Sequence, residues 1–246
     1  MKKKLIAVFL VVATLLSCVF AFAACDKDKG KDKGGKNGGT NDGTFDITNV
    51  ESVLRHLISY ASTLDDILII YNFPETEWDG GGTPESRLEL VEGEFVIYTY
   101  KTEQELEKEF GSYEPENNEY LAKIDSKTMV YCYDKNTYEK VKNADISKCA
   151  LPARLVEDFI NYAKIVKSNK KGGVSMEKED GYIKFRYSTS ELSKDDSVVG
   201  YYLLDGATDA QVSAFNAKVA ELNAKVSEGK AEVLSSDKNH IKVKML

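Results

Sequence analysis

The sequence predicts an α+β fold, in which an antiparallel β-sheet with a meander carries three to four helices on one face. Short β-branched and aromatic runs recur along the chain, and glycine, asparagine and aspartate separate them at hairpin-like intervals. Other segments place apolar residues three and four positions apart, the spacing of an amphipathic helix. Helices and strands follow one another in groups rather than in strict alternation, which favours antiparallel over parallel pairing.

The first 25 residues read as a secretion signal. Lys2, Lys3 and Lys4 precede an uncharged stretch over residues 5–24, and the small residues Ala23 and Ala24 lead to Cys25. This segment resembles the bacterial lipoprotein signal, whose lipobox ends in small residues and a cysteine. The resemblance implies removal of residues 1–24 and attachment of a diacylglyceryl group, a membrane anchor, to Cys25.

Two other interpretations of this segment stay open. Cys18 also ends a lipobox-like run, but apolar residues follow it, whereas Cys25 is followed by charged residues, where cleavage is expected. Residues 5–24 are also long enough to span a membrane without cleavage. Because the lysines precede the apolar stretch, every interpretation places the rest of the chain on the extracytoplasmic face of the cell membrane. Two acyl chains would hold it there stably.

A hydrophilic tether is expected over residues 25–44, followed by a single α+β domain over residues 45–246. The tether contains only charged, polar and glycine residues after Cys25, so it cannot bury enough surface to fold, and its typical reach is about 24 Å. Removing residues 1–24 takes three lysines and no acids from a net charge of −7, which leaves −10. Such an acidic chain is a poor candidate for binding nucleic acid.

The first part of the domain is predicted to contain two helices and several paired strands. A helix over 50–64 starts at a capping box of Thr48 and Glu51, and a short helix starts at a second box of Thr102 and Glu105, with Leu106 and Phe110 on its buried side. The expected strands cover 67–73, 87–91, 95–100, 120–124, 128–133 and 138–141, with the last three forming a meander.

The second part repeats this mixture. A helix with Pro152 in its first turn places Leu155, Val156, Phe159, Ile160, Ala163 and Val166 on one face and ends in lysines and glycines at 170–173. Strands are expected over 174–178, 182–187 and 198–204. Thr208 and Gln211 cap a last helix, with apolar positions at Val212, Phe215, Val219, Leu222 and Val226. Residues 231–234 and 240–245 close the chain as strands.

Few residues point to chemistry. Cys132 and Cys149 are a possible disulfide in an oxidising compartment, which would stabilise the fold by about 3 kcal/mol, and the alternative is that Cys132 is a buried free thiol. His56 and His240 are expected to be structural or solvated. The sequence contains no zinc-protease, nucleophile-elbow, phosphate-loop or dinucleotide motif. We therefore expect no catalytic residue, no metal and no cofactor.

Three functions remain as expectations. The first is non-enzymatic binding of an apolar or lipid-like ligand, because the early helix, the tyrosine-rich meander and the later covering helix are loosely similar to LolA/LppX-type lipoprotein carriers. That resemblance is one of architecture, and it implies a curved sheet holding acyl chains against helices. The second is a cell-surface protein-interaction module of an envelope complex. The third, least favoured, is a hydrolase with dispersed carboxylates.

Overall fold

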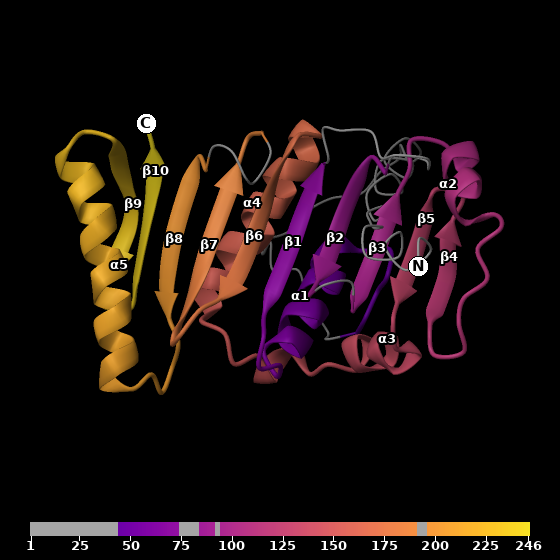
Figure 1. Cartoon of the computed structure of the whole chain (residues 1–246), viewed down its shortest axis with the longest axis horizontal. Helices are drawn as coiled ribbons and strands as arrows, with labels where there is room; N and C mark the ends of the chain where they lie inside the picture. Colours follow the sequence, from indigo (N-terminus) through magenta and orange to yellow (C-terminus); the bar gives the residue numbers. More distant parts are fainter. Residues whose placement is uncertain (1–43, 74–83, 92–93, 191–195) are drawn as a thin grey trace, which may run out of the picture.

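Ten strands form one continuous antiparallel sheet in a computed structural model, which describes residues 44–73, 84–91, 94–190 and 196–246. The strand order is β4-β5-β3-β2-β1-β6-β7-β8-β10-β9, and every neighbouring pair is antiparallel. Figure 1 shows the strands side by side, with β4 and β9 at the two edges. The predicted α+β class with an antiparallel sheet is confirmed.

The first half of the chain forms one side of the sheet, and the second half forms the other side. The first half comprises α1 (Val50–Ala61), β1 (Leu68–Phe73), β2 (Ser86–Leu90), β3 (Phe95–Thr99), α2 (Glu103–Phe110), β4 (Tyr120–Asp125), β5 (Thr128–Cys132), α3 (Lys135–Lys142) and the 3₁₀ turn η3 (Ile146–Lys148). The second half comprises α4 (Ala153–Asn169), β6 (Gly172–Lys178), β7 (Tyr182–Ser188), β8 (Val198–Leu203), α5 (Asp209–Ser227), β9 (Ala231–Asp237) and β10 (His240–Met245).

The two halves repeat the same topology. Each runs helix, three strands, helix, two strands, and each orders its strands as first, second, third, fifth and fourth. The halves meet where β1 pairs with β6, and because this pair is antiparallel, half a turn about an axis perpendicular to the sheet exchanges them. Even the caps correspond, since Thr102 with Glu105 and Thr208 with Gln211 both form complete capping boxes. The fold is therefore an internal structural repeat, which we call the duplication.

Helices cover both faces of the sheet. On one face, which we call the α4 face, Tyr162 of α4 lies 5.3 Å from the ring of Phe185, and Tyr138 of α3 stacks at 4.6 Å on Tyr120. Helix α1 lies in the same layer between α3 and α4. This face therefore carries α1, α3 and α4. The prediction that the helices share one face is wrong, because α2 and α5 pack on the opposite face.

The opposite face carries α2 and α5. Phe110 of α2 packs 4.9 Å from Tyr98 of β3, and Phe215 of α5 lies against Tyr182 of β7. Successive side chains of a strand point to opposite faces of the sheet. Tyr98 and Tyr182 therefore point away from the face whose side chains meet α1 and α4. Figure 1 shows α2 and α5 at opposite ends of the sheet, as the duplication requires.

Two hydrophobic clusters stabilise these layers. The larger joins α1 and α4 to β1, β2, β3, β5, β6 and β7, and its central side chains, among them Leu57, Phe159 and Phe185, are completely buried. The smaller lies between α5 and strands β8, β9 and β10, with Phe215 and Leu222 at its centre. The α5 end of the molecule therefore has a core of its own.

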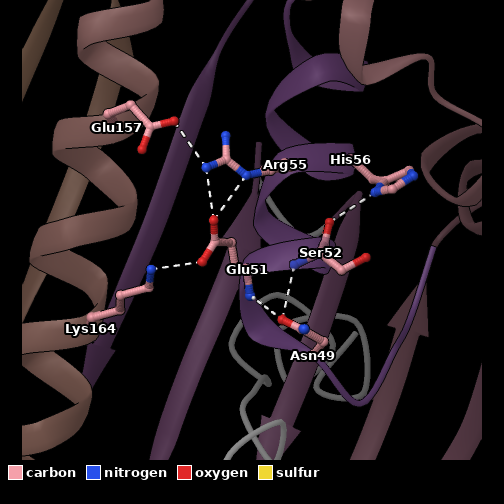
Figure 2. A network of polar contacts seen from close by, with 7 residues as sticks. All are labelled: Asn49, Glu51, Ser52, Arg55, His56, Glu157 and Lys164. Carbon is pink, nitrogen blue, oxygen red and sulfur yellow. Dashed lines mark hydrogen bonds and ion pairs between the residues drawn. The ribbon is translucent and has the colours of Figure 1, made fainter. Parts of the chain in front are cut away.

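An ion-pair network joins the first helices of the two halves, α1 and α4 (Figure 2). Arg55 of α1 binds Glu51 at 2.8 Å and Glu157 of α4 at 2.9 Å, and Lys164 of α4 binds Glu51 at 2.7 Å. Together with the β1–β6 ladder, this network fixes the junction of the halves.

The structure corrects two details of the sequence analysis. Residues 138–141 are not a strand but part of helix α3, because Asp134 caps the helix by accepting the N–H of Asn136, and Tyr138 and Val141 then lie on its inner side. The cap of α1 is Asn49 rather than Thr48, because the Asn49 side chain accepts the N–H groups of Glu51 and Ser52 (Figure 2). Thr48 instead bonds to Asp46.

The other predicted helices and strands are confirmed within one to three residues of their ends. All six positions predicted for the buried face of α4 are buried. In α5 only Phe215 and Leu222 are fully buried, and Val219 and Val226 pack at the margin of the cluster. Residues 74–83 and 92–93, which connect the predicted strands 67–73, 87–91 and 95–100, lie outside the described residues.

Candidate functional site

The two halves carry different side chains on the α4 face of their outer strands. In the first half, α3 covers the outer strands, and the β5 side chains beneath it, Thr128, Val130 and Cys132, are completely buried. In the second half, β10 takes the place of β5, and no described helix corresponds to α3. The equivalent β10 positions carry His240, Lys242 and Lys244. A shelf of titratable side chains thus replaces an apolar layer, and we call it the polar shelf.

The inner part of the shelf is a three-residue network. Asp158 of α4 accepts hydrogen bonds from the hydroxyl of Tyr202 on β8, at 2.6 Å, and from the ammonium group of Lys242 on β10. The Asp158 and Lys242 side chains are only 16% and 12% exposed. Burial, and then the bond to Asp158, raise the pKa of Tyr202, so its phenol stays a neutral donor. The network ties α4 to the second half of the sheet.

Gly200 allows Tyr202 to reach this network. A Cβ atom at position 200 would lie 2.9 Å from Cε2 of the Tyr202 ring, closer than a real contact permits. Without that atom, the ring lies along β8 and stacks on the ring of His240, with centroids 5.6 Å apart. The glycine therefore brings the inner network and His240 together.

The outer part of the shelf is centred on His240, which is 4% exposed. Its Nδ1 lies 2.9 Å from Oδ1 of Asp237, and its Nε2 lies 3.1 Å from Oγ of Ser235. Asp237 also accepts the backbone N–H groups of Asn239 and His240, and these bonds together with the His240 side chain lower the pKa of Asp237. A charged Asp237 fixes the proton of His240 on Nδ1 and leaves Nε2 as an acceptor.

Arg154 borders the shelf from the first turn of α4. A guanidinium nitrogen lies 3.4 Å from Nε2 of His240, and in the described part of the chain Arg154 forms no ion pair with a carboxylate. The cap residue of α4 is Pro152, which provides no side-chain hydrogen bond. An exposed cation and the N-terminus of a 17-residue helix therefore meet beside Ser235 and His240.

The residues singled out from the sequence lie elsewhere. Cys25 falls outside the described residues, so its lipidation remains a prediction. Cys132 and Cys149 are both free thiols in the structure, and burial raises the pKa of Cys132 to about 12. His56 is buried, with Nδ1 at 2.8 Å from the Ser52 carbonyl oxygen (Figure 2) and its ring against Phe45, which is a structural environment.

The sequence analysis missed the polar shelf. Its members come from α4, β8, β9 and β10, and their spacing matches no local motif. The available signal was the alternation of polar residues at 240, 242 and 244 in a strand whose other positions are apolar. Among the described residues, no group of histidine, cysteine and acidic side chains could hold a metal ion, and no helix is long and apolar enough to cross a membrane.

Comparison with known proteins gives no assignment. No protein-family model, curated protein or solved structure matches the chain.

Proposed function

We propose that the chain is a lipid-anchored extracytoplasmic binding protein that takes a carboxylate-bearing ligand on the polar shelf. The lipobox ending at Cys25 supports the anchor and the location. The observation that carries the binding role is the exposed Arg154 beside His240, which also contacts Ser235, at the N-terminus of α4.

The proposed ligand binds on the surface and not between the helices and the sheet. A carrier of acyl chains has to keep space between its helices and its sheet. Here Leu57 of α1, Phe159 of α4 and Phe185 of β7 meet in one cluster and are completely buried. Because the protein's own side chains fill this layer, an apolar ligand has less support there than a polar ligand on the shelf.

The charges of the shelf favour a monoanion. Arg154 offers a planar fork of N–H donors that matches a carboxylate, and the N-terminus of α4 adds partial positive charge. Asp158 and Asp237 lie at the inner and outer parts of the shelf, so a dianionic phosphate would meet more repulsion than a carboxylate. Ser235 adds a hydroxyl within reach of the same oxygen atoms.

Acetate is the simplest probe of this site. Titration of the mature chain with sodium acetate at constant ionic strength, followed by NMR, should give saturable binding. Arg154→Gln removes the unpaired cation and should weaken acetate binding at least about 10-fold, the effect of losing one charged hydrogen bond of 1.5–3 kcal/mol.

Lys238→Gln is the matched control, because it removes one positive charge from the exposed turn of the same β9–β10 hairpin. It should leave acetate binding within about 2-fold, since exposed charges interact weakly through solvent. Equal binding by the wild type and the Arg154→Gln variant would rule out the proposed site.

A further inference from the structure

We propose that the polar shelf is also an esterase site, with Ser235 as nucleophile, His240 as general base and Asp237 as the residue that orients the base. This inference rests on the ligand site proposed above and adds a reaction to it. A carboxylic ester is the substrate class, and the carboxylate that binds at Arg154 is the product.

The three side chains have the geometry that acyl transfer requires. Ser235 Oγ lies 3.1 Å from Nε2 of His240, and the opposite ring nitrogen, Nδ1, lies 2.9 Å from Oδ1 of Asp237. These are the nucleophile–base and base–orienter bonds, each at the nitrogen that its role demands. All three residues lie in one β-hairpin, so the pairing of β9 with β10 sets their relative positions.

The hydrogen bonds also select the active tautomer. Asp237 accepts the Nδ1 proton, and Arg154, which can only donate, lies 3.4 Å from Nε2. Nε2 therefore carries the lone pair, and it receives the Ser235 proton once the longer contact from Arg154 is given up to the substrate. The two backbone N–H groups bound by Asp237 hold its carboxylate in place for this task.

A β-bulge sets the direction of Ser235. Lys242 pairs with Ser235 and Val243 pairs with Val233, so Leu234 is an extra residue in β9. Bulges bend a strand and turn its side chains, and they are frequent beside active sites. Ser235 next to this bulge is half-buried on the α4 face, between the buried His240 and solvent, where an ester can approach.

The reaction proceeds through an acyl-enzyme. Ser235 Oγ attacks the ester carbon as its proton passes to Nε2 of His240, and the carbonyl electrons move to the oxygen, whose negative charge faces Arg154. Collapse breaks the bond to the alcohol, which leaves with the proton from His240. Water then attacks the acyl group, gives its proton to His240, and Ser235 leaves and regains that proton. The net change is ester plus water to acid plus alcohol.

Two measurements on the mature chain test this assignment. A fluorophosphonate probe, which phosphonylates activated serines, should add one label, and tandem mass spectrometry should place it on Ser235. Hydrolysis of p-nitrophenyl acetate should be catalytic and should be lost in Ser235→Ala. Ser236→Ala is the matched control, because this neighbouring serine is exposed and pairs with Ile241 on the other face. It should keep both labelling and hydrolysis.

Asp237→Asn tests the positioning role. An asparagine oxygen can still accept the N–H groups of Asn239 and His240, so the hairpin should keep its fold, but the neutral amide no longer fixes the His240 tautomer. We expect kcat to fall about 10⁴-fold with KM nearly unchanged. A purely structural Asp237 would leave kcat intact.

The outcomes separate this inference from the binding proposal. Labelling at Ser235 with loss of hydrolysis in Ser235→Ala supports the esterase. No label at Ser235, or equal hydrolysis by Ser235→Ala, overturns it, and if Arg154-dependent acetate binding persists, the binding role stands alone. If the wild-type chain shows neither labelling at Ser235 nor acetate binding, both proposals are overturned.

Discussion

Glu51 holds two cations from different halves of the duplication. It accepts hydrogen bonds from Lys164 and Arg55, and these contacts, with the Lys164 bond strongest, lower its pKa against the opposing effect of burial (Figure 2). A carboxyl group whose folded pKa is lowered stabilises the fold fully above its ordinary pKa of about 4.3, and this contribution is lost as the pH falls from that value through the lowered pKa of the folded state.

The variant Glu51→Gln should therefore be less stable at pH 7, and the difference should shrink as the pH falls below the ordinary carboxyl pKa and vanish below the lowered pKa of Glu51. Because the side chain is 29% exposed, we expect a loss of at most about 1 kcal/mol. Guanidinium unfolding across this pH range measures it. Glu157→Gln, which removes only the Arg55 contact of a half-exposed residue, should have a smaller effect. A Glu51→Gln difference that is independent of pH would contradict this role for the network.

Single residues were predictable where their partners are close in sequence. The capping boxes at Thr102 and Thr208 depend on a glutamate or glutamine three positions later, and both form as predicted. His240 is different, because the contacts that define it include Arg154 and Tyr202, which only the folded sheet brings near. These two distant contacts of His240 could not be predicted from the residues next to it in the sequence.

At the scale of elements, α5 is held to the sheet by few buried side chains. It is 19 residues long, yet only Phe215 and Leu222 are fully buried, and its cluster is separate from the main core. Stability within a protein follows the density of buried contacts. The α5, β9 and β10 elements should therefore open at a lower free energy than the central strands β1 and β6.

The variant Phe215→Ala tests this separation. Loss of a completely buried phenylalanine costs about 3–5 kcal/mol, and here the loss should fall on the small cluster. Native-state hydrogen exchange should show protection reduced in α5, β9 and β10 but retained in β1 and β6. Val219→Ala, at the margin of the same cluster, should give a smaller change in the same segments. A uniform loss of protection would show instead that the sheet opens as one unit.

One wrongly predicted element concealed the duplication. The sequence interpretation placed a strand at 138–141, which gave the first half three strands after its second helix instead of two. With α3 correctly assigned, the order of the halves is identical apart from that helix. The error arose because an eight-residue helix offers little periodicity, and aromatic and β-branched residues in a short run favour a strand assignment.

At the scale of the whole molecule, we expect a membrane anchor at Cys25 to precede the duplicated sheet. If Cys25 carries the diacylglyceryl group, Cys25→Ser should block lipidation and cleavage by the lipoprotein route and abolish labelling with radioactive palmitate. The parallel change Cys18→Ser distinguishes the two lipobox-like runs and should leave labelling intact. Labelling that persists in Cys25→Ser but is lost in Cys18→Ser would assign the anchor to Cys18.

The central claim is that the ligand site lies on the polar shelf of the second half, between the N-terminus of α4 and the β9–β10 hairpin. NMR mapping of the acetate titration on the isotopically labelled mature chain tests it most directly. The account predicts that amide shifts concentrate in the first two turns of α4 and in the β9–β10 hairpin around Ser235 and His240. Shifts confined to other elements, or no saturable shifts at all, would contradict it.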